Sequence, residues 1–217
     1  MKNAPVLPGI VHIVDDDAAF RKAIARLLKA ASHEPRLYAS AQEYLIADDK
    51  GSPACVLLDL RMPGYSGLEL QAALRRRENQ HPVIFLSGQG DIPSTVKAMR
   101  EGAVDFLTKP VQTDTLLDAI RRALEQDLQR RERFGHLLDV RQRYATLTPR
   151  ERQVMAGVVA GRLNKQICYA LQAAERTVKT HRSRVMEKMR VRSVAELVRL
   201  AEDLAEAGVA LEPIPGE

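Results

Sequence analysis

Five polar side chains with complementary chemistry each follow a short apolar run. Asp15 and Asp16 follow "IVHIV", Asp59 follows "CVLL", Ser87 follows "VIFL" and Lys109 follows "DFLT". Apolar runs of this length predict buried strands, and the carboxyl ends of parallel strands meet at one edge of a sheet. We therefore expect three carboxylates, a hydroxyl and an ammonium group to converge at that edge.

Converging carboxylates repel one another and raise one another's pKa unless a cation is present. The sequence has no Cys/His cluster that would select Zn²⁺, whereas Mg²⁺ is held by few protein oxygens and several waters. A carboxylate in such a site can act as a nucleophile and hold a phosphoryl group. The pattern therefore favours a Mg²⁺-dependent phosphoacceptor site, although each Asp taken singly is also typical of a helix cap.

The elements that must position these groups alternate along the first part of the chain. Apolar runs are followed by amphipathic stretches, which predicts a parallel sheet covered by helices on both faces. The expected strands span residues 10–14, 35–38, 54–59, 83–87 and 104–107. The expected helices span residues 18–31, 41–47, 67–77, 94–101 and 113 onward.

The remainder of the chain is expected to be helical. After Pro149 the predicted helices span residues 149–160, 164–171, 175–189 and 193–205. The sequence therefore predicts an α/β domain over 1–125, a helical linker over 126–147, a small all-α domain over 148–206 and a flexible tail over 207–217.

The composition is that of a soluble globular protein, because 45% of the 217 residues are hydrophobic. No apolar run has the length of a membrane span, and the N-terminal stretch lacks the pattern of a signal peptide, so we expect a cytoplasmic protein without membrane contact. Cys55 and Cys168 lie far apart in apolar settings. They indicate small buried thiols rather than a disulfide or a metal site.

The net charge of +5 belongs to the second part of the chain. Residues 126–217 contain 17 Lys and Arg against 12 Asp and Glu, while the two signs balance over 1–125. Within 148–200 there are 12 basic and 4 acidic residues. This excess suits a polyanion such as DNA, although a solvated helix face has a similar composition.

In this order the motifs of the first part resemble the receiver domain of two-component response regulators. The resemblance rests on "VDDD", "LLDLRMPGYSGLEL", "FLSGQGD" and "GAVDFLTKP", and it extends over residues 9–125. It implies a doubly wound, flavodoxin-like domain with a five-stranded parallel sheet. It also implies phosphorylation by a sensor histidine kinase, with Mg²⁺ as the cofactor.

The resemblance further implies a role for each residue that matches a family motif. Asp59 matches the phosphoacceptor, and Asp15 and Asp16 match the acidic pair that binds Mg²⁺. The backbone carbonyl of Arg61 matches a further metal ligand. Ser87 stands where the family has the Thr or Ser that captures the phosphoryl group.

Two more positions follow from the same resemblance. Lys109 matches the basic residue that pairs with the phosphoryl oxygens, and the Lys109–Pro110 peptide bond is often cis in the family. Phe106 occupies the aromatic switch position but lacks a Tyr hydroxyl. The sequence therefore leaves burial of the ring as the available response at this position.

The segment 148–200 is similar to the LuxR-type helix-turn-helix domain of the FixJ/NarL regulators, through "LTPRERQVMAGVVAGRLNKQICYAL" and "RTVKTHRSRVMEKMRVRSVAELVRLA". On a helical wheel, Val178, Val185 and Met189 lie on one face of the second motif. The opposite face can enter the major groove, where Arg and Lys read guanine and Thr or Ser reads more loosely. The expected DNA-binding residues are Arg176, Lys179, Thr180, Ser183, Arg184 and Lys188.

The turn before this helix departs from the family pattern. Where the family usually has Leu-Gly-Ile-Ser, this chain has "LQAA". Gln172 replaces a Gly that suits a left-handed helix stop, and Ala174 replaces an N-cap Ser, a loss of about 1 kcal/mol. Arg190 also stands where Gly is common. His181 is expected to pack, and His136 has no evident role.

The two resemblances together imply a transcription regulator in which phosphorylation of Asp59 promotes homodimer formation and promoter binding. One alternative is a DNA-binding protein whose receiver dimerises without phosphate. Another is an aspartate-nucleophile phosphohydrolase, but those enzymes carry a second Asp where this chain has Arg61. We therefore expect no enzyme activity beyond phosphorylation and dephosphorylation of Asp59 itself.

Overall fold

The computed structural model describes residues 8–47, 52–76, 81–88 and 92–214. The chain divides into two compact units, Met1–Arg131 and Glu132–Glu217, and the boundary falls within helix α5 (Thr113–Ala145). The first unit thus ends at Arg131 rather than at 125. No helix in the described ranges is both long and apolar enough to cross a membrane.

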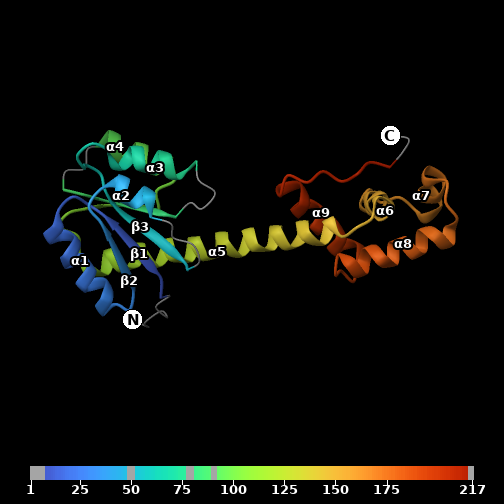
Figure 1. Ribbon diagram of the computed structural model, residues 1–217, viewed down its shortest axis with the longest axis horizontal. Coiled ribbons are helices and arrows are strands. Elements are labelled where there is room, and N and C mark those ends of the chain that lie inside the picture. Colours follow the sequence, from blue (N-terminus) through green and yellow to red (C-terminus); the bar gives the residue numbers. More distant parts are fainter. Residues whose placement is uncertain (1–7, 48–51, 77–80, 89–91, 215–217) are drawn as a thin grey trace. The chain divides into compact units, whose positions relative to one another are not determined.

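A five-stranded parallel sheet forms the centre of the first unit (Figure 1). Its strand order is β2-β1-β3-β4-β5, so the direction of winding reverses between β1 and β3. This is the doubly wound arrangement expected from the sequence. The strands are β1 (Ile10–Val14), β2 (Glu34–Tyr38), β3 (Ala54–Asp59), β4 (Val83–Ser87) and β5 (Asp105–Thr108).

Helices cover both faces of this sheet, as the alternating pattern predicts. One apolar cluster joins α1 and α5 to the sheet, and it includes Leu28 and Ile120. The other joins α2, α3 and α4 to the opposite face, and it includes Tyr44, Leu70 and Ala98. The helices besides α5 are α1 (Ala18–Ala30), α2 (Ala41–Ile46), α3 (Gly67–Leu74) and α4 (Ile92–Arg100).

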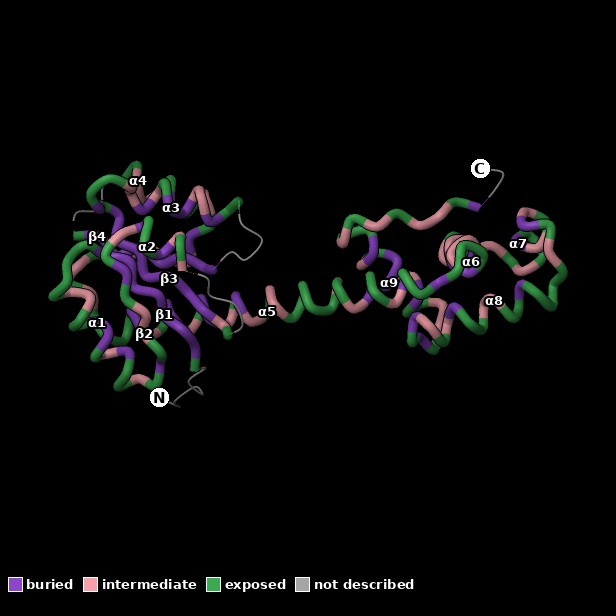
Figure 2. The backbone as a smooth tube through the Cα atoms, in the orientation of Figure 1, coloured by how far each residue is buried: buried purple, intermediate pink, exposed green. Residues whose placement is uncertain are grey.

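The three inner strands are buried along their whole length (Figure 2). Burial on both faces explains why β1, β3 and β4 are continuous apolar runs whose bounds were predicted correctly. The edge strands β2 and β5 each contain exposed residues, and their observed starts, at Glu34 and Asp105, differ slightly from the prediction. Helix α3 ends at Leu74, earlier than predicted, and Arg77 lies outside the described residues.

The two cysteines differ in burial. Cys55 lies in β3 and is buried, and this burial raises the pKa of its thiol. Cys168 is only partly buried, so the expectation of two buried thiols is wrong for this residue. Both are free cysteines, which agrees with the expectation that they form no disulfide.

A buried carboxylate fixes α5 to the start of β3, at the opposite end of that strand from Asp59. Asp127 is fully buried, and its Oδ2 accepts the Ala54 backbone N–H at 3.0 Å and the Arg131 Nε–H at 2.6 Å. Its Oδ1 pairs with Arg130. A buried charge needs such partners, because its loss of hydration is otherwise uncompensated.

Replacing Asp127 by Ala is expected to lower the free energy of unfolding of the first unit by about 3 kcal/mol, since one buried backbone donor and two guanidinium groups lose their acceptor. Hydrogen exchange of the β3 amides in the full chain at increasing urea concentrations measures this loss. The exposed ion pairs of Asp118 provide the control: Asp118→Ala should cost less than about 1 kcal/mol. Equal losses in both variants would contradict the anchoring role.

The second unit is all-helical. Helix α6 starts at a capping box in which Thr148 and Glu151 each bond the other's backbone N–H, with Pro149 in the first turn. The C-terminal part of α5 contributes Val140 and Tyr144 to the core of this unit. The helices besides α5 are α6 (Pro149–Val159), α7 (Asn164–Leu171), α8 (Glu175–Lys188) and α9 (Val194–Glu206).

His136, to which the sequence assigned no role, joins α5 to α9. Its Nε2 lies 2.8 Å from Asp203 Oδ2, and the Arg133 guanidinium lies 2.8 Å from the other oxygen of the same carboxylate. Arg133 also pairs with Glu206. These contacts fix the last turns of α5 as part of the helical unit.

The tail after α9 packs on the helices of this unit, so the prediction of a flexible tail is wrong for the described residues up to Ile214. Ile214 is 3% exposed and belongs to the core. A Cβ atom at Gly157 would lie 2.5 Å from the Ile214 side chain, so the absence of a side chain at Gly157 makes this contact possible. Arg152 also pairs with Glu212 at 3.0 Å.

Truncating Ile214 to Ala is therefore expected to lower the free energy of unfolding of the second unit by about 2–4 kcal/mol, as for other buried Ile side chains. Thermal unfolding followed by circular dichroism measures the loss. Leu163, which is 70% exposed, serves as the control, and Leu163→Ala should change stability little. A frayed tail would make the two variants indistinguishable.

Candidate phosphoacceptor site and DNA-binding helix

An ammonium group joins the ends of three parallel strands. Lys109 follows β5, and its Nζ lies 2.6 Å from Asp15 Oδ2, after β1, and 2.7 Å from Asp59 Oδ1, at the end of β3. Asp15 is 1% exposed and Asp59 is 7% exposed. The structure thus brings together three of the residues that the sequence predicted to converge, from positions far apart in the chain.

Backbone amides fix the remaining oxygens of both carboxylates. The Arg61 N–H donates to Asp59 Oδ2 at 2.8 Å, and the Asp17 N–H donates to Asp15 Oδ1 at 2.8 Å. Asp17 is itself the N-cap of α1 and accepts the N–H groups of Ala19 and Phe20. The turns after β1 and β3 therefore hold each carboxylate in one orientation.

Burial and charge act in opposite directions on these groups. Burial raises the pKa of Asp59, since the charged carboxylate loses hydration, and the hydrogen bond and positive charge of Lys109 reduce this increase. Burial also acts to lower the Lys109 pKa, but the two carboxylates outweigh burial and raise it. Lys109 is therefore protonated at neutral pH and compensates the buried negative charge.

The donor set suits a hard cation with few protein ligands. Within the described residues, no group of three His, Cys, Asp or Glu side chains could hold a metal ion. Asp15 and Asp59 converge on one ammonium group, while Asp16, the residue after Asp15, is exposed. Mg²⁺ needs only one or two carboxylates because waters complete its shell, so these oxygens fit it. The role of the Arg61 carbonyl stays a prediction.

Ser87 and Lys109 are coupled through the backbone. Ser87 is buried at the end of β4, beside Asp59 in the order of strands, and its carbonyl accepts the Lys109 N–H at 2.8 Å. The Lys109–Pro110 peptide bond is cis. Ser87 therefore ends its strand at the same sheet edge as Asp15 and Asp59, as the sequence predicts.

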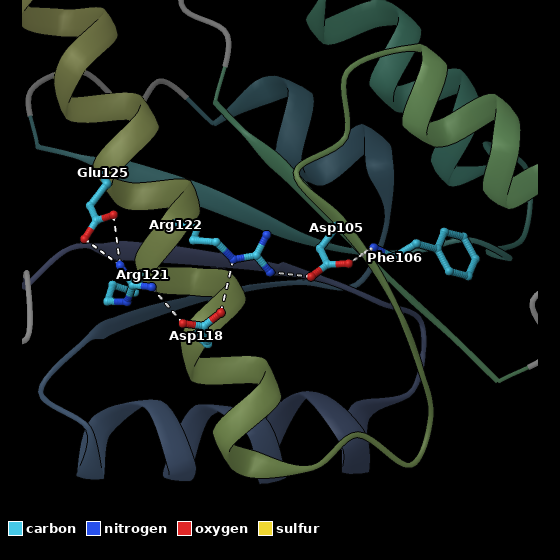
Figure 3. Close-up of polar contacts among 6 residues, drawn as sticks. All are labelled: Asp105, Phe106, Asp118, Arg121, Arg122 and Glu125. Atoms are coloured by element: carbon cyan, nitrogen blue, oxygen red, sulfur yellow. Dashed lines mark hydrogen bonds and ion pairs between the residues drawn. The ribbon is translucent and has the colours of Figure 1, made fainter. Parts of the chain in front are cut away.

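Phe106 is partly buried and lies near the core of β4. Its ring stacks on Phe85 with 5.9 Å between centroids. Figure 3 shows the ring directed away from the neighbouring Asp105, whose carboxylate accepts from Arg122 of α5 at 2.6 Å. Further ion pairs of Asp118, Arg121, Arg122 and Glu125 extend along α5 (Figure 3). This network fixes the start of β5, the strand that leads to Lys109.

Only some of these ion pairs could be predicted from the sequence. The pairs Asp118–Arg122 and Arg121–Glu125 have the i, i+4 spacing of helix ion pairs, which is visible without a structure. The pairing of Asp105 with Arg122 depends on α5 lying beside β5, so no spacing signals it.

Gly67 permits a close approach of α3 to the end of β3. A Cβ atom at this position would lie 2.4 Å from the Asp59 carbonyl oxygen and 3.0 Å from the Phe85 ring. Both neighbours belong to buried strands, and one of them is the backbone carbonyl of Asp59 itself. The motif "PGYSGLEL" therefore contains a glycine required by packing at the start of α3.

We expect Gly67→Ala to lower the free energy of unfolding by about 1–3 kcal/mol, as overpacking of a core does. Gly88→Ala is the matched control, because a Cβ atom at Gly88 would meet no atom within 4 Å. Urea denaturation of the two variants measures the difference. A Gly67→Ala variant as stable as the control would show that the turn can shift without cost.

Helix α8 has one buried and one exposed face. Val178 and Val185 are buried in the helical core. Arg182 donates to Asn164 Oδ1 of α7 at 3.0 Å, which fixes the two helices to each other. The residues of α8 expected to contact DNA that are exposed are Arg176, Lys179, Thr180, Ser183 and Arg184.

Lys188 differs from the other expected DNA-binding residues. Its Nζ lies 2.6 Å from Glu151 Oε2, a nearly buried carboxylate, and 3.1 Å from the Thr146 carbonyl oxygen. It would have to leave Glu151 to reach a phosphate. Lys179 pairs with exposed Glu175 at 3.0 Å, and an exposed ion pair of this kind contributes little to stability.

Comparison with known families agrees with both folds. The model for the response regulator receiver domain matches residues 11–121, and the model for bacterial regulatory proteins of the luxR family matches residues 145–201. The first match alone covers more than half of the chain. The chain belongs to the two-component response regulators. It is a transcription regulator with a receiver domain and a LuxR-type DNA-binding domain.

Full-length relatives support this assignment. Nodulation protein W of Bradyrhizobium diazoefficiens is 44% identical over 90% of this chain and 86% of its own. The transcriptional regulatory protein FixJ of the same organism is 40% identical over 89% and 94%. Among solved structures, the response regulator StyR is 40% identical, with a TM-score of 0.81 over 90% of this chain and 99% of its own.

The response regulator carries the turn departures that its sequence indicates. Gln172 and Arg190 have φ values of 48° and 55°, in the left-handed region that favours glycine. Ala174 is the N-cap of α8 and provides no side-chain hydrogen bond. The helix-turn-helix nevertheless forms, because the core around Val178, Val185 and Leu171 is complete.

Restoring the cap should therefore stabilise this domain. Ala174→Ser is expected to raise its free energy of unfolding by about 1 kcal/mol, since the hydroxyl can accept an unpaired N–H of the first turn. Ser193, which caps α9 by accepting the Glu196 N–H at 3.2 Å, gives the reverse test: Ser193→Ala should cost a similar amount. Denaturant midpoints of the two variants check both signs.

Proposed function

We propose that this response regulator accepts a phosphoryl group on Asp59 from a sensor histidine kinase, and that phosphorylation controls homodimer formation and binding to promoter DNA. The observation that carries the proposal is the pairing of buried Asp15 and Asp59, from two different strand ends, by the one partly buried ammonium group of Lys109. An Asp that only caps a helix, as Asp17 does, needs no more than backbone N–H partners.

In the proposed reaction, a carboxylate oxygen of Asp59 attacks the phosphorus of a phosphohistidine. An acyl phosphate bond forms, the nitrogen–phosphorus bond breaks, and the electron pair of that bond leaves with the imidazole. Lys109 can remain paired with the negative charge during the transfer, because its Nζ already lies 2.7 Å from Asp59 Oδ1. Its ammonium then pairs with a phosphoryl oxygen rather than with the carboxylate.

The cofactor we propose is Mg²⁺, for which one or two of the Asp15, Asp16 and Asp59 carboxylates and the Arg61 carbonyl would be direct ligands, while waters complete the shell. When bound, it neutralises negative charge on the phosphoryl oxygens. Within the chain, the Asp17 and Arg61 amides keep the two buried carboxylates oriented toward this site. The buried setting strengthens every charge interaction made there.

The response to phosphorylation is proposed to involve Ser87 and Phe106. A phosphoryl group adds about −1.5 to −2 charges and three acceptor oxygens, and the Ser87 hydroxyl at the adjacent strand end can donate to one of them. Phe106 then takes a more buried position. Reversing a two-state equilibrium from about 1:99 to 99:1 requires about 5.5 kcal/mol of differential stabilisation.

For DNA binding, we propose that α8 enters the major groove with Lys179, Thr180 and Ser183 toward the bases and Arg176 and Arg184 near phosphates. All five side chains are exposed on one domain whose net charge is positive. A phosphorylated dimer would contact two half-sites separated by the helical repeat of DNA. Lys188 stays a prediction for a phosphate contact.

Asp59→Asn tests the phosphoacceptor. The chain is incubated with a small phosphodonor and Mg²⁺, and intact mass is measured. We expect one phosphoryl group on the unchanged chain and none on Asp59→Asn, which should remain folded because the neutral amide loses less hydration on burial. Asp139→Asn, which changes a partly exposed carboxylate in the other unit, is the control. Equal labelling of Asp59→Asn would refute the assignment.

Lys179→Ala tests the DNA contact. If Lys179 reads a base, the variant should lose about 1–3 kcal/mol on a cognate site and much less on random DNA. A phosphate contact would instead weaken both and reduce the salt slope by about one unit. Titrations at several salt concentrations distinguish the two. Lys29→Ala, in the receiver domain, controls for the loss of charge. Unchanged affinity throughout would exclude the proposed placement of α8.

A further inference from the structure

An aromatic ring faces the ammonium group of the phosphoacceptor site. The Lys109 Nζ lies 4.1 Å from the centroid of the Phe20 ring. The same Nζ donates to Asp15 and Asp59. The ammonium group is thus held by two carboxylates and by the negative face of an aromatic ring.

Backbone hydrogen bonds connect the residue that carries this ring to Asp15. Phe20 lies in the first turn of α1, and its N–H donates to the N-cap Asp17 at 3.1 Å. The Asp17 N–H in turn donates to Asp15 at 2.8 Å. Phe20 also packs against the apolar cluster between α1, α5 and the sheet. The backbone that carries the ring is therefore connected to Asp15 through Asp17, and the ring itself is packed on one side.

A neutral ring, unlike a further carboxylate, accepts no conventional hydrogen bond from Lys109 and so leaves its N–H groups available to other acceptors. It attracts the ammonium group without supplying a hydrogen-bond acceptor, so the N–H groups of Lys109 remain directed toward the carboxylates. When a phosphoryl group is added to Asp59, those N–H groups must be offered to new oxygens. A ring contact preserves this freedom while limiting the sideways motion of a long, flexible side chain.

We propose that Phe20 is a positioning residue that holds Lys109 for phosphoryl transfer to Asp59. This inference rests on the proposed function, because it assigns a role within that reaction. Phe20 contacts no reacting atom itself. Its part is to keep the ammonium group where charge develops in the transition state.

The first experiment compares the phosphorylation rate constants of full-length variants with acetyl phosphate and Mg²⁺. Phe20→Leu keeps an apolar side chain but removes the ring, and we expect a decrease of about 3- to 30-fold. Phe20→Tyr retains the ring and should react at nearly the original rate. Leu27→Ala, in the same helix and the same apolar cluster, should destabilise the fold and leave the rate unchanged.

The second experiment changes the electrostatics of the ring and retains its shape. Phenylalanines with one, two and three fluorine atoms, placed at position 20, progressively weaken the negative face of the ring. The rate constant should fall stepwise along this series. The same series at Phe134, which is 56% exposed on α5, should have no effect.

The possible outcomes distinguish a failure of the proposed function from a failure of the role of Phe20 alone. Absence of a label on the unchanged chain would overturn the proposed function and this inference together. A labelled chain whose rate is flat along the fluorine series, or follows stability alone, would overturn only the role of Phe20. A stepwise decrease with rescue by Tyr supports it.

Discussion

The fold of the receiver domain brings one cation to two buried carboxylates, and the rest of the domain depends on that contact. Asp15, Asp59 and Lys109 end three different strands, so each lies correctly only if the sheet has its full order and register. Two buried carboxylates without Lys109 would carry uncompensated negative charge. The same pairing places a carboxylate and a cation next to each other, as the proposed phosphoryl transfer requires.

The long helix α5 contributes to both domains through polar contacts of different kinds. Near its start, exposed ion pairs connect it to Asp105 at the beginning of β5 (Figure 3). Further along, fully buried Asp127 accepts the Ala54 amide at the beginning of β3. Both strands therefore begin at contacts with α5 and end at the acidic site. The same helix continues to Ala145 and contributes to the core of the DNA-binding domain.

The DNA-binding domain keeps its fold although its turn lacks the usual residues. Gln172 takes a left-handed conformation that favours glycine, and Ala174 leaves α8 without a side-chain cap. Local costs of this size are small beside the burial of Val178, Val185 and the other core residues. The tail adds Ile214 to the same core, which increases the apolar area buried by a small domain. Packing thus outweighs the local preferences of the chain.

The sequence by itself determined the inner strands and the alternation of strands with helices, because burial on both faces requires continuous apolar runs. It also determined which residues meet at one edge of the sheet, because parallel strands bring their carboxyl ends together. Comparison with the family pattern also pointed to Gln172 and Arg190, two of the three non-glycine residues of positive φ in the described ranges, and to the missing cap at Ala174. Only the tertiary structure decided which side chains from distant parts of the chain touch. It brings the Phe20 ring to Lys109, Asp127 to the Ala54 amide and Lys188 to Glu151, and it buries Ile214 in the core of the second unit. Such contacts have no spacing or period in the sequence, since they arise from how separate elements pack in three dimensions.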